Sequence, residues 1–216
     1  MNIRKFGHCC LLIEEKGVRI LTDPGTFTSE QDNIKGIDII LITHEHQDHF
    51  HVPSVKAMLR NNPHAEVVTN HSVGKLLEKE HLPFRVVGDG ERATIKGIVI
   101  EGIGTAHAII HPELPGVENT GYFLAGKLFY PGDAFTVPEK YTDVLALPTA
   151  GPWMKVSEAI DYARAVKPRI CFPVHDAVVV EGMHSLMTRL AQTLLAPRGI
   201  AYHPLGAGES FDTDKV

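Results

Sequence analysis

The stretch that most constrains the fold of this chain is DIILITHEHQDHF, residues 38–50. Residues 37–43, IDIILIT, form a nearly continuous apolar run, which is typical of a strand covered on both faces. Three histidines and an aspartate follow directly, within residues 44–49. In layered sheets of this kind, ligand sites lie beyond the carboxyl ends of the strands. The stretch therefore predicts a buried strand that ends in a polar site.

The rest of the chain alternates short strands with helical segments. Further strands are expected at 8–14, 17–22, 65–69, 84–87, 94–101, 121–125, 127–130, 144–148 and 169–174, and helices at 53–60, 71–80, 156–166 and 183–195. Turns at Lys16-Gly17 and in the AGK stretch at 125–127 join neighbouring strands into hairpins. This pattern indicates mixed sheets covered by helices, a layered α/β or α+β domain. At 216 residues and 44% hydrophobic, with no linker or repeat, one domain over 1–216 is the expected organisation.

Charge and composition exclude several classes of protein. A formal charge of -5 disfavours a nucleic-acid partner, whose phosphates attract positively charged surfaces. No segment approaches the roughly 18 apolar residues of a membrane span, and the short apolar run near the N-terminus is no signal peptide. Three cysteines, two of them adjacent at Cys9 and Cys10, argue against a disulfide framework. We expect a cytoplasmic protein with a small-molecule substrate, and the oligomeric state, including a homo-oligomer, stays open.

The polar cluster has the chemistry of a metal site. In an extended turn alternate residues face the same way, so His44, His46 and Asp48 can converge while His49 points elsewhere. Neutral imidazole and carboxylate suit a divalent ion such as zinc. One ion cannot take all four groups from so short a loop, but two ions can. The competing interpretation is a solvated loop whose histidines only titrate.

Further ligands should come from isolated polar residues that follow other apolar runs. His107 comes after IVIEGIGTA, Asp133 lies in LFYPGDAF, and His175 follows RICFPV. Because each stands just past an expected strand, all three are candidates for the edge of the sheet at which the 44–49 cluster lies.

Six motifs, in order, carry a resemblance to a known family: FGHCCLLIE, ILTDPG, IDIILITHEHQDH, YPGDAF, LPTAGPWM and FPVHDA. Over residues 3–180 the chain resembles the metallo-β-lactamase superfamily, and more narrowly its branch of ascorbate-6-phosphate lactonase-like metal-dependent hydrolases. The resemblance implies a four-layer αββα sandwich, in which two mixed β-sheets face each other and helices flank them.

The resemblance also implies a ligand assignment for two divalent metal ions. One ion would be held by His44, His46 and His107, the other by Asp48, His49 and His175, with Asp133 bridging both. Zinc is favoured, and manganese or iron also suits this donor set. Asp23, in LTDPG, would orient a ligand histidine; the simpler alternative is an aspartate that starts a Pro-Gly turn.

The expected reaction is hydrolysis of a small ester, lactone or phosphoester. Two ions that share a water lower its pKa to about 7, which supplies a hydroxide nucleophile. Asp48 would accept a hydrogen bond from that hydroxide and pass a proton to the leaving oxygen. His111, in the irregular segment HAIIHPELPGVENTGY, would bind an anionic group or protonate the leaving group, unless it is a surface histidine without a role. No G-x-S-x-G motif offers a serine nucleophile.

Three alternatives to this function stay open at this point. The first is a phosphodiesterase for a small nucleotide or lipid phosphodiester. The second is a di-iron redox protein, although such relatives typically carry glutamate where this chain has His46. The third is a non-catalytic metal-binding module. Cys9 and Cys10 are expected to pack in the core. Trp153 and Met154 are expected to pack in the core as well, rather than to form an apolar wall of the substrate site. His8 is expected either to face the site or to end a strand.

Overall fold

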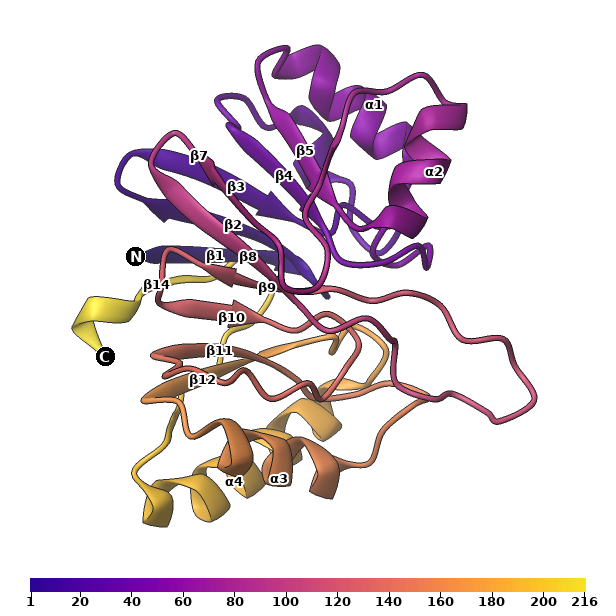
Figure 1. The fold of residues 1–216 in the computed structure, drawn as a ribbon. Helices are drawn as coiled ribbons and strands as arrows, with labels where there is room; N and C mark the ends of the chain where they lie inside the picture. Colours follow the sequence, from indigo (N-terminus) through magenta and orange to yellow (C-terminus); the bar gives the residue numbers. More distant parts are fainter.

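Two mixed β-sheets lie face to face in the computed structural model, which describes residues 1–216, and helices cover their outer faces (Figure 1). The first sheet has the order β14-β1-β2-β3-β4-β5-β6 and the second β13-β12-β11-β10-β9-β8-β7. This is the predicted αββα architecture, and the prediction of fold class is confirmed.

The elements of the first half-sandwich are β1 (Asn2–Gly7), β2 (Cys10–Glu15), β3 (Val18–Thr22), β4 (Ile39–Ile42), α1 (Val52–Asn61), β5 (Glu66–Thr69), α2 (His71–Lys79), β6 (Arg85–Val86) and β14 (Ser210–Asp212). Those of the second are β7 (Arg92–Ile95), β8 (Ile98–Ile103), β9 (Gly121–Leu124), β10 (Leu128–Tyr130), β11 (Val144–Pro148), α3 (Val156–Val166), β12 (Ile170–Val174), α4 (Glu181–Leu195) and β13 (Ala201–Tyr202). Short 3-10 turns lie at Glu30–Asn33, Ala196–Arg198 and Thr213–Lys215. No helix is both long enough and apolar enough to cross a membrane.

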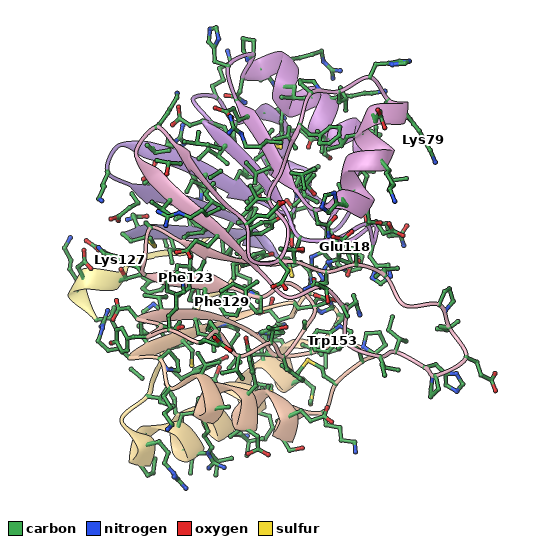
Figure 2. The ribbon with its side chains drawn as sticks, viewed as in Figure 1. Lys79, Glu118, Phe123, Lys127, Phe129 and Trp153 are labelled. Atoms are coloured by element: carbon green, nitrogen blue, oxygen red, sulfur yellow. The ribbon has the colours of Figure 1, made fainter.

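The continuous apolar runs of the central strands fill two cores at once. In β4, Ile39 and Leu41 point into the core between the sheets, whereas Ile40 and Ile42 pack toward α1 and α2. Successive side chains of a strand point to opposite faces, so a strand buried on both faces needs apolar residues at every position. In the second sheet, Phe123 and Phe129 likewise belong to the outer core under α3 and α4 (Figure 2).

Strand direction places the loops that matter at one edge of each sheet. In the first sheet β1, β3 and β4 run the same way, because β2 is antiparallel to both of its neighbours and β3 is parallel to β4. In the second sheet β8, β10 and β12 run the same way by the same reasoning. The loops that follow these six strands carry the candidate metal ligands of the site described below, and Trp153 follows β11, which is parallel to β10 and β12.

Two strand predictions were wrong in detail. The single strand expected at 94–101 is the hairpin of β7 and β8, with a turn at Lys96-Gly97 whose φ angles are 48° and 82°. These angles belong to the tight turns that match strand twist, and the Lys-Gly pair was the missed signal. The strand expected from residue 8 begins at Cys10, because His8 and Cys9 form the turn that follows the unpredicted strand β1.

Candidate metal centre

Two groups of metal-ligating side chains meet where the loops after the six strands converge. In each group the ligand atoms lie within 4.8 Å of one another. The first group consists of His44, His46 and His107; the second consists of His8, Asp48, His49 and His175. Histidines from the loop after β4, in the first sheet, thus stand beside residues that follow β8 and β12 in the second.

The carboxylate of Asp133 lies between the two groups. Its Oδ2 is 3.3 Å from His107 Nε2 and 2.9 Å from His175 Nε2. Its Oδ1 is 3.1 Å from His49 Nε2. The same Oδ2 is 4.0 Å from His44 Nε2. Asp133 therefore faces both groups, as a bridging ligand must.

The alternation argument for the 44–49 loop was wrong for Asp48. It grouped Asp48 with His44 and His46, but Asp48 lies with His49 and His175, its Oδ2 being 3.7 Å from His49 Nε2 and 3.4 Å from His175 Nε2. The loop is a tight turn, in which the His46 carbonyl accepts hydrogen bonds from the amides of residues 49 and 50. The two-residue period of extended chain does not apply to such a turn.

Two glycines allow neighbouring backbones to approach this loop. A Cβ at Gly25 would lie 1.9 Å from the carbonyl oxygen of Asp48, so the LTDPG turn fits against the loop only without a side chain. Gly132 has φ +64°, and a Cβ there would lie 2.3 Å from Oδ1 of Asn119. That oxygen accepts a hydrogen bond of 3.0 Å from the Asp133 amide, which fixes the backbone below the central carboxylate.

Three residues of the site have left-handed backbone conformations. The φ angle is 50° at His8, 38° at Asp23 and 58° at His175. Residues other than glycine rarely adopt this region, and when they do the surrounding structure must hold them there. The other five such residues lie in hairpin turns or at helix ends, and His8 lies in the turn between β1 and β2. Asp23 and His175 have this conformation outside any such turn, and both are at the site.

The hydrogen bonds of the imidazoles test whether the cluster fits metal ions. His49 donates from Nδ1 to Asp23 Oδ2 over 2.7 Å, and His107 donates from Nδ1 to the Ala108 carbonyl over 2.5 Å. His44 Nδ1 lies 3.0 Å from Thr43 Oγ1, whose own hydrogen is donated to Asp23. In all three histidines Nε2 is buried and has no hydrogen-bond partner. Metal-ligating histidines have this arrangement, and buried polar atoms without partners are otherwise rare.

Asp23 is the anchor of this arrangement. It is fully buried and accepts hydrogen bonds from the Thr43 amide and hydroxyl, both at 2.8 Å, and from the Tyr130 hydroxyl at 2.7 Å, besides that of His49. The prediction that Asp23 orients a histidine of the cluster is confirmed, and it does more than start a turn.

The carboxylates make the cluster attractive to positive charge. Burial lowers the pKa of His175, but hydrogen bonds to Asp133 and Asp48 outweigh burial and raise that pKa to about 10. Burial also opposes the charge of His49, yet Asp133 helps to raise its pKa well above the ordinary value. Conversely, burial lowers the pKa of His44 far below the ordinary value. A neutral His44 has the lone pair that a metal ion needs.

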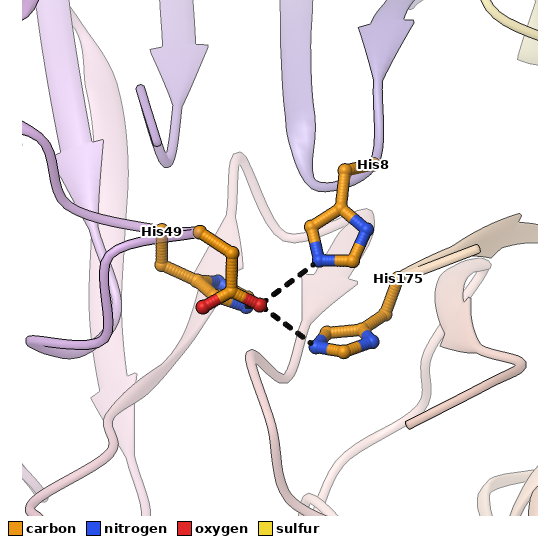
Figure 3. Close-up of side chains that lie close together, drawn as sticks. His8, His49 and His175 are labelled. Atoms are coloured by element: carbon orange, nitrogen blue, oxygen red, sulfur yellow. Dashed lines mark hydrogen bonds and ion pairs between the residues drawn. The ribbon is translucent and has the colours of Figure 1, made fainter. Parts of the chain in front are cut away.

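Two residues that the sequence left undecided lie at the site. Trp153 is buried, as expected for a residue that packs in the core (Figure 2). In addition, its Nε1 donates a 2.9 Å hydrogen bond to Asp133 Oδ2, which the sequence did not predict. His8 Nε2 lies 3.1 Å from Asp48 Oδ2, and Figure 3 shows His8 and His175 on either side of one carboxylate oxygen. Their positions could be suspected only from the motifs GHCC and GPWM, each just past a strand end.

Cys9 and Cys10 pack as predicted. The thiol of Cys9 is buried in the core between the sheets, and that of Cys10 lies in the outer core of the first sheet. Burial raises the pKa of Cys10 well above its ordinary value, which keeps that thiol protonated. The sulfur of Cys9 is also within 4.8 Å of ligand atoms of His49 and Asp133.

A cleft of about 390 Å³ opens onto the centre between residues 46–48 and Pro152. His46 and Asp48 are the partly exposed members of the cluster and stand at this opening. His111 lies on the exposed part of the loop between β8 and β9, where its Nδ1 accepts a 3.2 Å hydrogen bond from the Glu113 amide. No hydrogen bond joins His111 to the cluster, and its role in catalysis stays a prediction.

Known proteins share this fold and much of this sequence. The family model described as "Beta-lactamase superfamily domain" matches residues 2–175. Protein Rv0786c of Mycobacterium tuberculosis is 42% identical over 184 residues, which cover 83% of this chain and 85% of the relative. The UPF0173 metal-dependent hydrolase MJ1163 of Methanocaldococcus jannaschii is 24% identical over 180 residues, which cover 79% of this chain and 82% of the relative.

A solved structure from Parabacteroides distasonis, of a protein assigned as a metal-dependent hydrolase, superposes with a TM-score of 0.76 at 26% identity. The superposition covers 94% of this chain and 91% of that one. The family model spans most of the chain, including the 44–49 loop and the positions of Asp133 and His175. The chain therefore belongs to the beta-lactamase superfamily and is a metal-dependent hydrolase, like its named relatives.

Proposed function

We propose that the centre holds two divalent metal ions and hydrolyses a small ester, lactone or phosphoester, as the resemblance to the lactonase-like branch implies. The observation that carries the proposal is the set of three buried Nε2 atoms, on His44, His49 and His107, that have no hydrogen-bond partner and stand around the Asp133 carboxylate. Nitrogen and oxygen donors without cysteine suit zinc first, and manganese or iron as well.

The assignment of ligands follows the two groups. His44, His46 and His107 would hold one ion, Asp48, His49 and His175 the other, and Asp133 would contact both. When bound, the two ions supply an ionised water near neutral pH and stabilise negative charge on the oxygen of the substrate.

The residues of the chain supply the geometry and the proton transfer. Asp48 stands at the opening with a partly exposed carboxylate, so it can accept a proton from the attacking water and return it to the leaving oxygen. Trp153 and Asn119 hold the side chain and the backbone amide of Asp133, respectively. A rigid central carboxylate keeps the reacting groups in position during the reaction.

A cleft at the centre favours catalysis over a purely structural role. Structural metal sites are closed by protein ligands, whereas catalytic sites keep a position open to substrate. Here His46 and Asp48 line the cleft of about 390 Å³ and both are partly exposed. A phosphodiesterase for small diesters would use the same cleft and is the second candidate. The cytoplasmic location expected from the cysteines stays a prediction.

The test compares His46→Ala with the wild-type protein, both loaded with zinc or manganese, on p-nitrophenyl esters and bis(p-nitrophenyl) phosphate. We expect His46→Ala to lower kcat/KM at least a hundredfold, because the half-exposed imidazole holds an ion at the opening. His64→Ala, which removes an exposed histidine away from the cluster, is the control and should keep the wild-type rate. Equal rates for wild type and His46→Ala would refute the catalytic proposal, and metal analysis of the same samples reports how many ions each holds.

A further inference from the structure

We propose that the substrate carries an apolar group beside the reacting bond, and that this bond is a carboxylic ester or lactone rather than a phosphoester. The inference rests on the proposed hydrolytic function and narrows its substrate class. It comes from a second pocket, here called the loop pocket, of about 480 Å³, formed by His46 and by residues 107–112 and 114–117.

The loop pocket adjoins the metal centre. His46 and His107 line both the loop pocket and the cleft over the centre, and Ile110 also borders both. A substrate whose reacting bond lies in the cleft can therefore extend a substituent across these histidines into the loop pocket. The two spaces therefore meet at three side chains, two of which, His46 and His107, the proposal already assigns to metal binding.

The side chains of the loop pocket are mostly apolar. Apart from His46 and His107 at the shared wall and His111 on the loop, its lining is Ala108, Ile109, Ile110, Pro112, Leu114, Pro115, Gly116 and Val117. Ile109 is 74% exposed and Leu114 is 55% exposed, which is unusual for large aliphatic side chains grouped on one loop. An apolar substituent in the pocket would remove part of this surface from water.

No lysine or arginine lines either the cleft or the loop pocket. Sites for phosphate groups usually place arginine or lysine beside the phosphate oxygens, because charge-assisted hydrogen bonds are stronger than hydrogen bonds between neutral groups. A phosphate monoester would find only the ions and the imidazoles of the lining here. A neutral ester or lactone carbonyl needs no such cation.

Hydrogen bonds fix the base of the loop. The His107 amide donates to the Val117 carbonyl over 3.1 Å, and the Asn119 amide donates to the Thr105 carbonyl over 3.4 Å. The Ala108 amide donates to the Asp133 carbonyl over 2.8 Å, so the start of the loop is tied to the central residue of the site. The tip then projects away from the sandwich beyond the strand ends (Figure 1). An anchored base places the pocket at a fixed position relative to the centre.

The expected effect follows from burial of methylene groups. Full burial of one CH₂ changes an equilibrium or rate constant about fourfold, and half burial about twofold. Across p-nitrophenyl acetate, butyrate, hexanoate and octanoate, at constant leaving group, we expect kcat/KM to rise about two- to fourfold per methylene until the pocket is filled. Under the same conditions p-nitrophenyl phosphate and bis(p-nitrophenyl) phosphate should react more slowly than the butyrate.

Two variants and one control locate the effect. Ile109→Ser and Leu114→Ser should flatten the chain-length series while the acetate rate stays within about twofold, because acetate does not reach the aliphatic wall. Val137→Ser removes an aliphatic side chain of similar exposure, 46%, from a different loop and should leave the series unchanged. Binding of N-butyl and N-octyl acetamide, followed by calorimetry, reports the pocket without turnover, and the octyl compound should bind more tightly.

The outcomes separate this inference from the proposed function. A flat ester series, a preference for the phosphate compounds, or equal binding of the two acetamides would overturn the apolar substrate class while hydrolysis stands. If no compound is hydrolysed but the octyl amide binds more tightly than the butyl amide and Leu114→Ser removes the difference, the pocket is supported and the hydrolytic function is refuted.

Discussion

A single buried carboxylate, Asp23, holds the loop that carries most of the predicted ligands. It accepts hydrogen bonds from the backbone and side chain of Thr43, from Tyr130 and from His49. Partners that hold a ligand histidine typically contribute 10- to 100-fold to metal affinity. Removal of such a partner should therefore cause a measurable loss of metal affinity, although the ligands themselves are unchanged.

We predict that Asp23→Asn weakens zinc binding about 10- to 100-fold. An amide has one acceptor oxygen, so it cannot accept all of these hydrogen bonds and turns its NH₂ group toward one of the donors. Competition with a chromophoric chelator measures the affinity. Tyr130→Phe removes only one of the hydrogen bonds to Asp23, together with the contact of the same hydroxyl with the Cys9 carbonyl, at nearly constant volume, and should cause a smaller loss of affinity. Wild-type affinity in Asp23→Asn would show that His49 needs no anchor.

His8 differs from the other histidines of the cluster in its hydrogen bonds. The Ala177 amide donates to His8 Nδ1 over 3.3 Å, so the proton of the neutral ring is on Nε2, which faces Asp48. Burial lowers the pKa of His8, which favours that neutral form. A ring nitrogen that carries a proton has no lone pair for an ion, so His8 positions Asp48 instead of ligating.

We predict that His8→Ala lowers kcat/KM about tenfold or more, the value of one hydrogen bond to a charged group, without changing the number of bound ions. Elemental analysis and steady-state kinetics on the same preparation test both parts. Loss of one metal equivalent in His8→Ala would make His8 a ligand and contradict the tautomer argument.

At the scale of elements, close backbone contacts position the metal loop. The turn after β3 contacts the loop after β4, because the Thr26 amide donates a hydrogen bond to the Gln47 carbonyl over 2.8 Å. Gly25 has no side chain, which lets the two backbones approach each other closely. The turns around the site contain prolines, glycines and residues with positive φ angles. These turns follow regular strands and therefore lie at one edge of the sheets. The strands themselves carry none of the ligands.

We predict that Gly25→Ala destabilises the protein by about 2 kcal/mol or more and lowers metal content, because its Cβ would lie 1.9 Å from the Asp48 carbonyl oxygen. Chemical denaturation and elemental analysis measure the two effects. Gly182→Ala is the matched control: it lies in α4 with open space around its Cβ, and alanine there should stabilise by up to about 1 kcal/mol. Equal stability of the two variants would contradict the packing argument.

At the scale of the whole molecule, the centre joins the two sheets. Its residues follow β1, β3 and β4 in the first sheet and β8, β10 and β12 in the second, so bound ions would connect both halves of the sandwich. Any ligand that binds the folded state alone stabilises it by about 2.7 kcal/mol at a concentration one hundred times its Kd.

We therefore predict that removing the ions with a chelator lowers Tm by about 5–10 °C, since each kcal/mol is worth about 2–4 °C in a chain of this size. Scanning calorimetry with and without added zinc measures the shift. His46→Ala should show a smaller shift, and His64→Ala the same shift as wild type. An unchanged Tm after full metal removal would show that the sheets hold the centre without help from the ions.

Much of the architecture follows from local pattern. The run IDIILIT predicted β4 because a doubly covered strand has a distinctive composition, and the helices at 53–60, 71–80 and 156–166 were found within two residues at each end. The prediction of a single strand at 94–101 was wrong because the Lys96-Gly97 turn was taken as part of that strand. Strand β1 was missed because its alternating pattern, NIRKFG, is short and begins with polar residues.

The sequence by itself determined the fold class and which residues could carry chemistry, because hydrophobic periodicity and residue type are local properties of the chain. Only the tertiary structure decided that His8 faces Asp48, that Trp153 hydrogen-bonds Asp133, and that an apolar loop borders the centre. The two hydrogen bonds join residues 40 and 20 positions apart, respectively. Their geometry depends on how two sheets pack and where their turns end, which no local pattern encodes.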